Sequence, residues 1–115
     1  MEERRRLKRE HIMFYSRVFD RETGAFLGYL GDLTPIGAMV IAEHRMEPET
    51  DVQLRIDLPE DMYPKPILNV AAQSVWCQRD VDPRFYNIGF SFQELSPEDV
   101  AIVEQVIQDF RLEDR

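Results

Sequence analysis

Residues 52–58 constrain the fold most, because apolar and polar side chains alternate there without a break. Alternation with a period of two is typical of a strand that buries one face against a core. Five other segments have strand-like composition, and polar, glycine-bearing or proline-bearing runs separate them. These segments are residues 11–19, 25–30, 36–42, 67–78 and 85–92. The third strand in chain order, 36–42, is apolar on both sides, which predicts that both of its faces are covered.

The end of the chain has the periodicity of a helix. Ser96 is a typical N-cap, Pro97 suits the first helical position, and two acidic residues follow at the positive end of the helix dipole. Apolar residues then recur at helical spacing as far as Phe110. Six strands without intervening helices, followed by one helix, predict a mainly β fold: a six-stranded antiparallel β-barrel with a C-terminal α-helix.

The chain length and the lack of an inner boundary predict a single domain of 115 residues. Its parts would be a flexible basic N-terminal segment, a barrel and a helix, at residues 1–10, 11–93 and 96–112. With 43% hydrophobic residues, the chain can bury a core. We therefore expect a folded domain in which only the basic segment is mobile.

Several function classes are excluded by what the sequence lacks. Cys77 is the only cysteine, which excludes an internal disulfide and a cysteine-rich zinc site. His11 and His44 do not have the spacing of metal ligands. No nucleophile–base pair or phosphate-binding glycine loop stands out, so we expect neither an enzyme nor a cofactor. The absence of a signal peptide and of a long apolar run predicts a cytoplasmic protein without membrane insertion.

Charge is divided unevenly along the chain. The net charge is −8, but residues 1–10 sum to +2 and residues 11–115 sum to −10. An acidic body should repel DNA and RNA, because general nucleic-acid affinity needs a broad basic surface. The basic run Arg4–Arg9 could still hold a small anion, although such a run is also typical of a solvated terminus.

A polar turn at residues 31–37 lies between two of the predicted strands. Pro35 fits the first inner position of a β-turn and Gly37 its last position. Asp32 and Thr34 have short polar side chains that hydrogen-bond to nearby backbone. The turn is therefore either a plain hairpin or a corner at which a carboxylate, a hydroxyl and an uncovered backbone receive a polar ligand.

Three motifs together resemble the PilZ domain, the bacterial receptor module for cyclic di-GMP. Residues 5–9, Arg-Arg-Leu-Lys-Arg, fit the family's RxxxR, and residues 32–37, Asp-Leu-Thr-Pro-Ile-Gly, fit its [DN]xSxxG with threonine for serine. Residues 87–92, followed by 95–98, resemble the family's last strand and the start of its terminal helix. The resemblance spans residues 4–110 and implies the same barrel with a C-terminal helix.

The resemblance also implies a ligand site. Arg5 and Arg9 would grip cyclic di-GMP from the N-terminal segment, since guanidinium groups fork onto phosphate or onto guanine O6 and N7. Asp32 would accept hydrogen bonds from the guanine N1–H and amino group, Thr34 would offer a hydroxyl, and Gly37 would let the ligand approach the backbone. Secondary ligand candidates are Arg4, Arg6 and Trp76.

By this resemblance the chain is a non-catalytic second-messenger receptor. Binding would order the N-terminal segment and so signal to an unidentified effector protein, or change the oligomeric state towards a homodimer. In bacteria such modules act in motility and biofilm formation. The alternative is a PilZ-like protein-interaction module, related to pili or motility, that binds no nucleotide.

Overall fold

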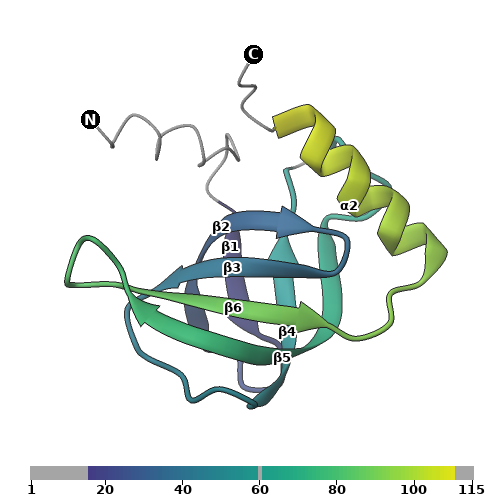
Figure 1. Ribbon diagram of the computed structural model, residues 1–115. Coiled ribbons are helices and arrows are strands. Elements are labelled where there is room, and N and C mark those ends of the chain that lie inside the picture. The colour runs from purple at the N-terminus through teal and green to yellow at the C-terminus, as the bar shows by residue number, and fades with distance from the viewer. Residues whose placement is uncertain (1–15, 60, 111–115) are drawn as a thin grey trace.

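The computed structural model describes residues 16–59 and 61–110, which form a closed β-barrel and one helix (Figure 1). The strands follow the order β1-β2-β3-β6-β5-β4 around the barrel, and every neighbouring pair is antiparallel. The predicted six-stranded barrel with a C-terminal helix is confirmed. The elements are β1 (Arg17–Asp20), β2 (Phe26–Thr34), β3 (Gly37–Ala42), β4 (Asp51–Asp57), β5 (Ile67–Arg79), β6 (Tyr86–Phe92) and α2 (Pro97–Phe110).

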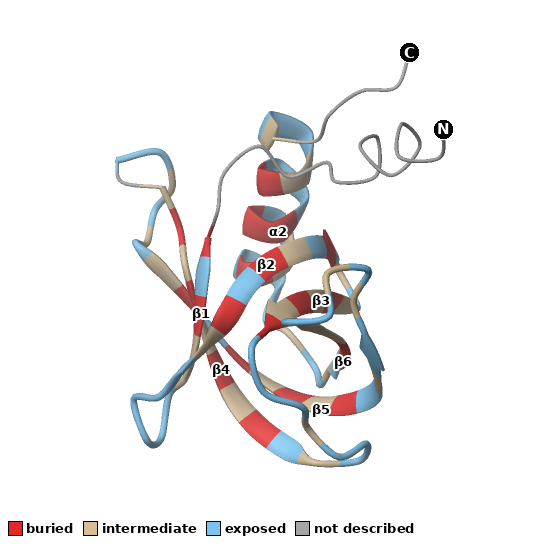
Figure 2. Ribbon diagram, turned by 90° about the vertical axis from the view of Figure 1, so that its left-hand side faces the viewer, coloured by how far each residue is buried: buried red, intermediate tan, exposed pale blue. Residues whose placement is uncertain are grey.

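Alternate side chains of every strand point into the barrel and form its core, so that buried and exposed residues alternate along the ribbon (Figure 2). The alternation predicted from residues 52–58 is present in β4, whose inward residues are almost fully buried. Apolar side chains fill the interior. The buried ones larger than alanine are Val18, Leu30, Leu33, Val40, Val52, Leu54, Ile56, Leu58, Leu68, Val70, Ile88, Phe90, Ile102, Val103 and Val106.

Helix α2 lies beside the end of the barrel at which β2 turns into β3 (Figure 1). Its first turn is capped as predicted, because the backbone N–H of Asp99 donates to Ser96 Oγ at 3.1 Å. Two side chains of the loop between β4 and β5 hold the helix. Lys65 Nζ lies 2.7 Å from Asp99 Oδ1, and the Tyr63 hydroxyl donates to Asp109 Oδ2 at 2.7 Å.

The opposite end of the barrel is closed by residues 43–50, the loop between β3 and β4. Ser74 of β5 is fully buried, and its hydroxyl donates to the carbonyl of Glu47 at 2.7 Å and accepts from the N–H of Thr50 at 2.9 Å. Met46 packs from this loop against the core. Both ends of the barrel are therefore covered, which leaves the outer faces of the strands as its open surface.

The structure corrects two expectations about strand 25–30 and strand 36–42. The former continues to Thr34, because a β-bulge at Gly31 lets the chain keep its pairing with β3. The outward residues of β3 are only half-buried, so no second layer built from the described residues covers that face. Residues 11–15 of the first predicted strand and 111–112 of the predicted helix lie outside the described residues. In the described part of the chain, no helix has the length and apolar character needed to cross a membrane.

Candidate functional site

The turn between β2 and β3 is a two-residue hairpin held together by Thr34. The Thr34 hydroxyl accepts hydrogen bonds from the N–H groups of Ile36 and Gly37, at 3.2 and 3.1 Å, and donates to the Gly37 carbonyl at 3.3 Å. Pro35 occupies the first inner position of the turn, as the sequence predicted. Thr34 therefore has a structural role in the hairpin, whatever else it contacts.

Gly37 is needed at its position for a reason that the sequence did not show. It pairs with Ser91 of β6, and an added Cβ would overlap the carbonyl oxygen of Phe90 on that strand. Its backbone does not have a positive φ, so the need for glycine comes from the close approach of β6 rather than from the turn. The expectation that Gly37 leaves room for a ligand is not tested by this contact.

The bulge at Gly31 decides where the Asp32 carboxylate points. Leu30 pairs with Val40 and Asp32 with Met39, so the extra residue between them keeps Asp32 on the outer face and Leu33 in the core. Asp32 Oδ1 accepts the N–H of Leu33 at 2.9 Å. Within residues 16–59 and 61–110, Oδ2 has no hydrogen bond or ion pair, so this exposed oxygen is available to a donor from a ligand.

Strand pairing places Asp32 at one end of a row that crosses four strands. Asp32 of β2 pairs with Met39 of β3, Met39 pairs with Gly89 of β6, and Gly89 pairs with Trp76 of β5. Three strand spacings separate the ends of the row, or about 14 Å. We call these four residues the outer row. Thr34 and Gly37 begin the neighbouring row on the same face, so Asp32, Thr34 and Gly37 lie together at the hairpin. Trp76 shares their outer face but lies three strands away from Asp32.

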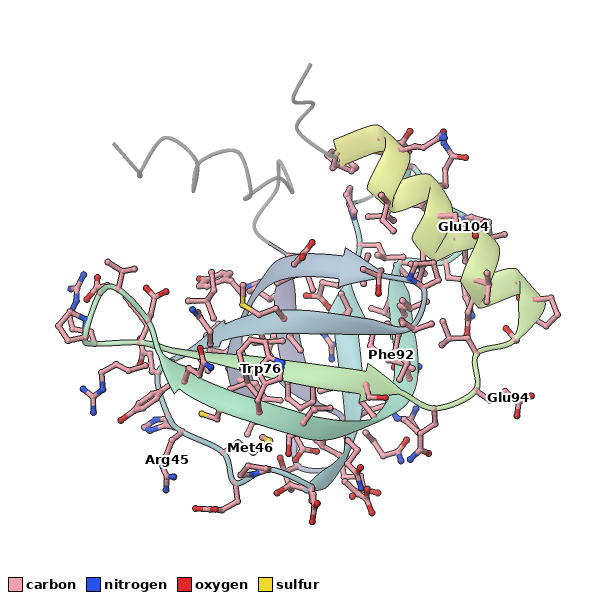
Figure 3. All side chains as sticks on the ribbon, viewed as in Figure 1. Arg45, Met46, Trp76, Phe92, Glu94 and Glu104 are labelled. Carbon is pink, nitrogen blue, oxygen red and sulfur yellow. The ribbon has the colours of Figure 1, made fainter. Side chains whose placement is uncertain are left out.

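Trp76 lies flat against the barrel because the residue beneath it is glycine. A β-bulge in β5 lies between Ser74 and Trp76, and it leaves Val75 and Trp76 both exposed. A Cβ at Gly89 would overlap the indole, which covers the outer face of β6 (Figure 3). The indole is still 40% exposed, so it is an aromatic surface open to solvent rather than a core side chain.

The four predicted arginines, Arg4, Arg5, Arg6 and Arg9, lie outside the described residues. The described chain begins at Ser16, whose carbonyl accepts the N–H of Leu30 at 2.8 Å and whose hydroxyl donates to the carbonyl of Asp57. Because β1 is antiparallel to β2, the chain enters the barrel next to Leu30, on the side towards Asp32. The seven residues from Arg9 to Ser16 span at most about 25 Å, which is more than the length of the outer row.

The shifted pKa values of the described residues belong to groups outside the outer row. A hydrogen bond with Asp99 raises the pKa of Lys65, and burial together with the Asp109 carboxylate raises the pKa of Tyr63. The hydrogen bonds from Arg84 lower the pKa of Asp82 to about 2. The first two groups hold α2, and the third stabilises the turn between β5 and β6. No group of three or more metal-ligating side chains occurs among the described residues.

Sequence reasoning missed Met39 and Gly89, the two middle residues of the outer row. Glycine inside an alternating strand is a known signal of close approach, and Gly89 stands between Ile88 and Phe90 in such a pattern. The residue that approaches it cannot be read from the sequence, because the pairing of Gly89 with Trp76 depends on the β5 bulge.

Comparisons with known proteins agree with the geometry. The structure is similar to the PilZ domain with c-di-GMP of YcgR from Escherichia coli, with a TM-score of 0.63 and 15% identity over 84% of this chain and 80% of that one. It is also similar to the Bacillus subtilis inhibitor of motility MotI/DgrA, with a TM-score of 0.68 and 14% identity over 89% of this chain. The match spans 50% of MotI/DgrA, so this chain corresponds to about half of that protein.

No curated protein matched the sequence. At these identities the two solved structures show a shared fold. The family model for the PilZ domain, in contrast, matches residues 3–109, which is nearly the whole sequence and includes both the RxxxR segment and the hairpin. The chain therefore belongs to the PilZ domain family.

Proposed function

We propose that this protein is a non-catalytic receptor for cyclic di-GMP, located in the cytoplasm. The observation that carries the proposal is the outer face itself, where Asp32 and the exposed Trp76 indole lie in one row. One Asp32 carboxylate oxygen has no partner within residues 16–59 and 61–110, and the row begins beside the point where the described chain starts. The c-di-GMP bound to the YcgR PilZ domain supports the choice of ligand.

Each residue has a role that suits the chemistry of the ligand. Arg5 and Arg9 supply forked donors to the two phosphates or to guanine O6 and N7. Asp32 Oδ2 accepts from the N1–H and amino group of a guanine, which arginine cannot do because it has no acceptor. Thr34 contributes mainly by holding the hairpin that presents Asp32, and Gly37 by letting β6 pack against that hairpin.

The proposed signal is a change in the N-terminal segment. The basic side chains of residues 1–10 repel one another when they are drawn together, and two phosphates neutralise that repulsion. Binding then orders the segment across the outer face next to Asp32, which changes the surface that an effector protein or a second copy of the chain contacts. Motility is the process that the inhibitor MotI/DgrA points to.

Isothermal titration of the purified protein with cyclic di-GMP tests the ligand. We expect saturable heat and no turnover, with weaker binding as salt rises because the contacts are ionic. Cyclic di-AMP is the matched control, since it has the same phosphates but lacks the guanine donors that Asp32 accepts. A flat titration of folded protein with cyclic di-GMP at high micromolar concentration would overturn the proposal.

Amide hydrogen exchange over residues 4–12 tests the signal separately. We expect protection to increase in this segment when cyclic di-GMP binds, while the amides of β4 stay unchanged. If the segment is equally protected with and without ligand, the ordering mechanism is wrong even where the titration shows binding.

The structure also gives one reason to keep a second candidate, a PilZ-like interaction module that binds no nucleotide. Thr34 and Gly37 both have structural roles in the hairpin, so the fold alone needs these two motif positions. Asp32 distinguishes the candidates, because its Oδ2 has no structural partner in the described chain. Under the second candidate, Asp32→Asn leaves every measured property unchanged and the titration is flat.

A further inference from the structure

Glycines lie beneath the two large side chains of the outer row. Gly89 has no side chain, and the Trp76 indole occupies the space where one would project. On the other side, Gly31 lies beneath Met39, whose methyl carbon would be 3.0 Å from an added Cβ. The surface between Asp32 and Trp76 therefore consists of the Met39 thioether side chain and the face of the Trp76 indole.

Two features hold the indole in this position. The β5 bulge turns Trp76 outward, and Ser74, on the other side of the bulge, is anchored by its hydroxyl to the loop at residues 47–50. Because Gly89 has no side chain, the Trp76 ring packs flat on β6 instead of projecting away from it. An exposed aromatic face that rests on the strand beneath it is a stacking surface for nucleobases, since every base has a π-face.

We propose that Gly89 is a positioning residue for the ligand, because it seats the Trp76 indole as the stacking surface for one guanine while Asp32 receives the edge of a guanine at the other end of the row. This inference rests on the proposed function. It assigns Trp76 a contact with the base rather than a packing role, and it explains why the strand has glycine at residue 89. The methyl group of an alanine at residue 89 would displace the Trp76 ring from the outer face of β6.

The test uses the full chain, with cyclic di-GMP as the probe, and the emission of Trp76, the only tryptophan. Stacking on guanine should quench the emission of the wild-type protein in proportion to the heat of binding. Trp76→Ala should weaken binding by about 5- to 150-fold, the range for losing one stacked base. Phe26→Ala is the matched control, because Phe26 is an aromatic residue of similar exposure outside the row, and it should bind like the wild type.

Gly89→Ala tests the positioning role directly. The ring atoms that an added Cβ would meet belong to a half-exposed side chain that can move, so we expect a small change in melting temperature, a shifted emission maximum and weaker binding. In the Trp76→Ala background the same change should weaken binding by less than about twofold, because there is no ring left to displace. Should Gly89→Ala fail to fold, the double variant has room for the methyl group and should fold.

The outcomes separate this inference from the proposed function. If the wild type binds and Trp76→Ala binds as tightly, the stacking role is wrong and the receptor proposal stands. If Gly89→Ala weakens binding equally with and without the indole, the positioning role is wrong. If the wild type does not bind cyclic di-GMP at all, both the proposed function and this inference are wrong. In that case the emission shift of ligand-free Gly89→Ala protein still reports the contact between residue 89 and Trp76.

Discussion

The inner and outer faces of β2, β3, β6 and β5 belong to the same strands but differ in almost every physical property. Leu33, Val40 and Phe90 on the inner face are almost fully buried. On the outer face, Asp32 and Trp76 are exposed, and Gly89 has no side chain to project. Residues with opposite environments are therefore consecutive in the sequence, as in Asp32–Leu33 and Phe90–Ser91.

The difference shows how one barrel separates stability from binding. The inner face is close-packed apolar surface, so its residues determine the free energy of unfolding. The outer row is more exposed, and it carries the indole and the Asp32 carboxylate oxygen that has no partner among the described residues. Substitutions on the inner face should therefore lower the free energy of unfolding and leave ligand affinity unchanged. Substitutions of neighbouring residues on the outer face should weaken ligand binding with little effect on stability.

The largest effect is expected on the inner face. Phe90→Ala removes a ring that is 4% exposed and should lower the free energy of unfolding by about 3–5 kcal/mol. Molecules that remain folded should bind cyclic di-GMP with nearly unchanged affinity. Ser91→Ala, one residue further along and exposed, should change stability by less than about 0.5 kcal/mol. Urea unfolding and calorimetric titration of the two variants check this, and equal stability losses would break the comparison.

The next largest effect should be on binding alone. Arg9→Ala, or Arg5→Ala, removes charge-assisted hydrogen bonds worth about 1.5–3 kcal/mol, so affinity should fall roughly 10- to 150-fold. The melting temperature should stay within about one degree, since replacing a charged side chain removes little apolar surface that a core could bury. Arg45→Ala is the matched control, because it removes the same charge from the covered end of the barrel. Normal binding by Arg9→Ala contradicts the assignment of the arginines.

A smaller effect is expected for Asp32→Asn. The side-chain carbonyl of asparagine can still accept the N–H of Leu33, while an amide group replaces the free Oδ2. We expect about tenfold weaker binding, corresponding to about 1.4 kcal/mol, and an unchanged melting temperature. A variant that is destabilised but binds normally would mean that Asp32 serves the hairpin rather than the ligand.

The smallest effect concerns a turn that belongs to neither face. Arg84 donates to both oxygens of Asp82, and the pKa of that carboxyl is lowered from 3.8 to about 2. A lowered pKa stabilises the fold above pH 4, and this contribution is lost as the pH falls from about 4 to 2. Arg84 is exposed and Asp82 is only half-buried, so solvent screens the pair and its share should be barely measurable. A carboxyl NMR titration should show the shift in the wild type and its loss in Arg84→Ala, without any change in affinity at neutral pH.

The sequence was sufficient to predict the strand count, the barrel and the capped helix, because alternation and capping are local signals in 52–58 and 96–99. It predicted the hairpin and offered Asp32 as a ligand candidate, but it ended the second strand too early. The reason is that a bulge at Gly31 preserves strand pairing while it shifts the register, and nothing in the local pattern indicates that shift. The neighbours Met39 and Gly89 depend on pairing between distant strands, which a local pattern cannot provide.

The central claim is that cyclic di-GMP binds on the outer face of β2, β3, β6 and β5. Methionine methyl groups test it directly, because Met39 lies in the outer row whereas Met46 packs at the closed end of the barrel. In a ¹³C-methyl NMR titration with cyclic di-GMP, the Met39 signal should move with ring-current shifts while the Met46 signal stays in place. A Met39 signal that is unchanged at saturating ligand would contradict the account.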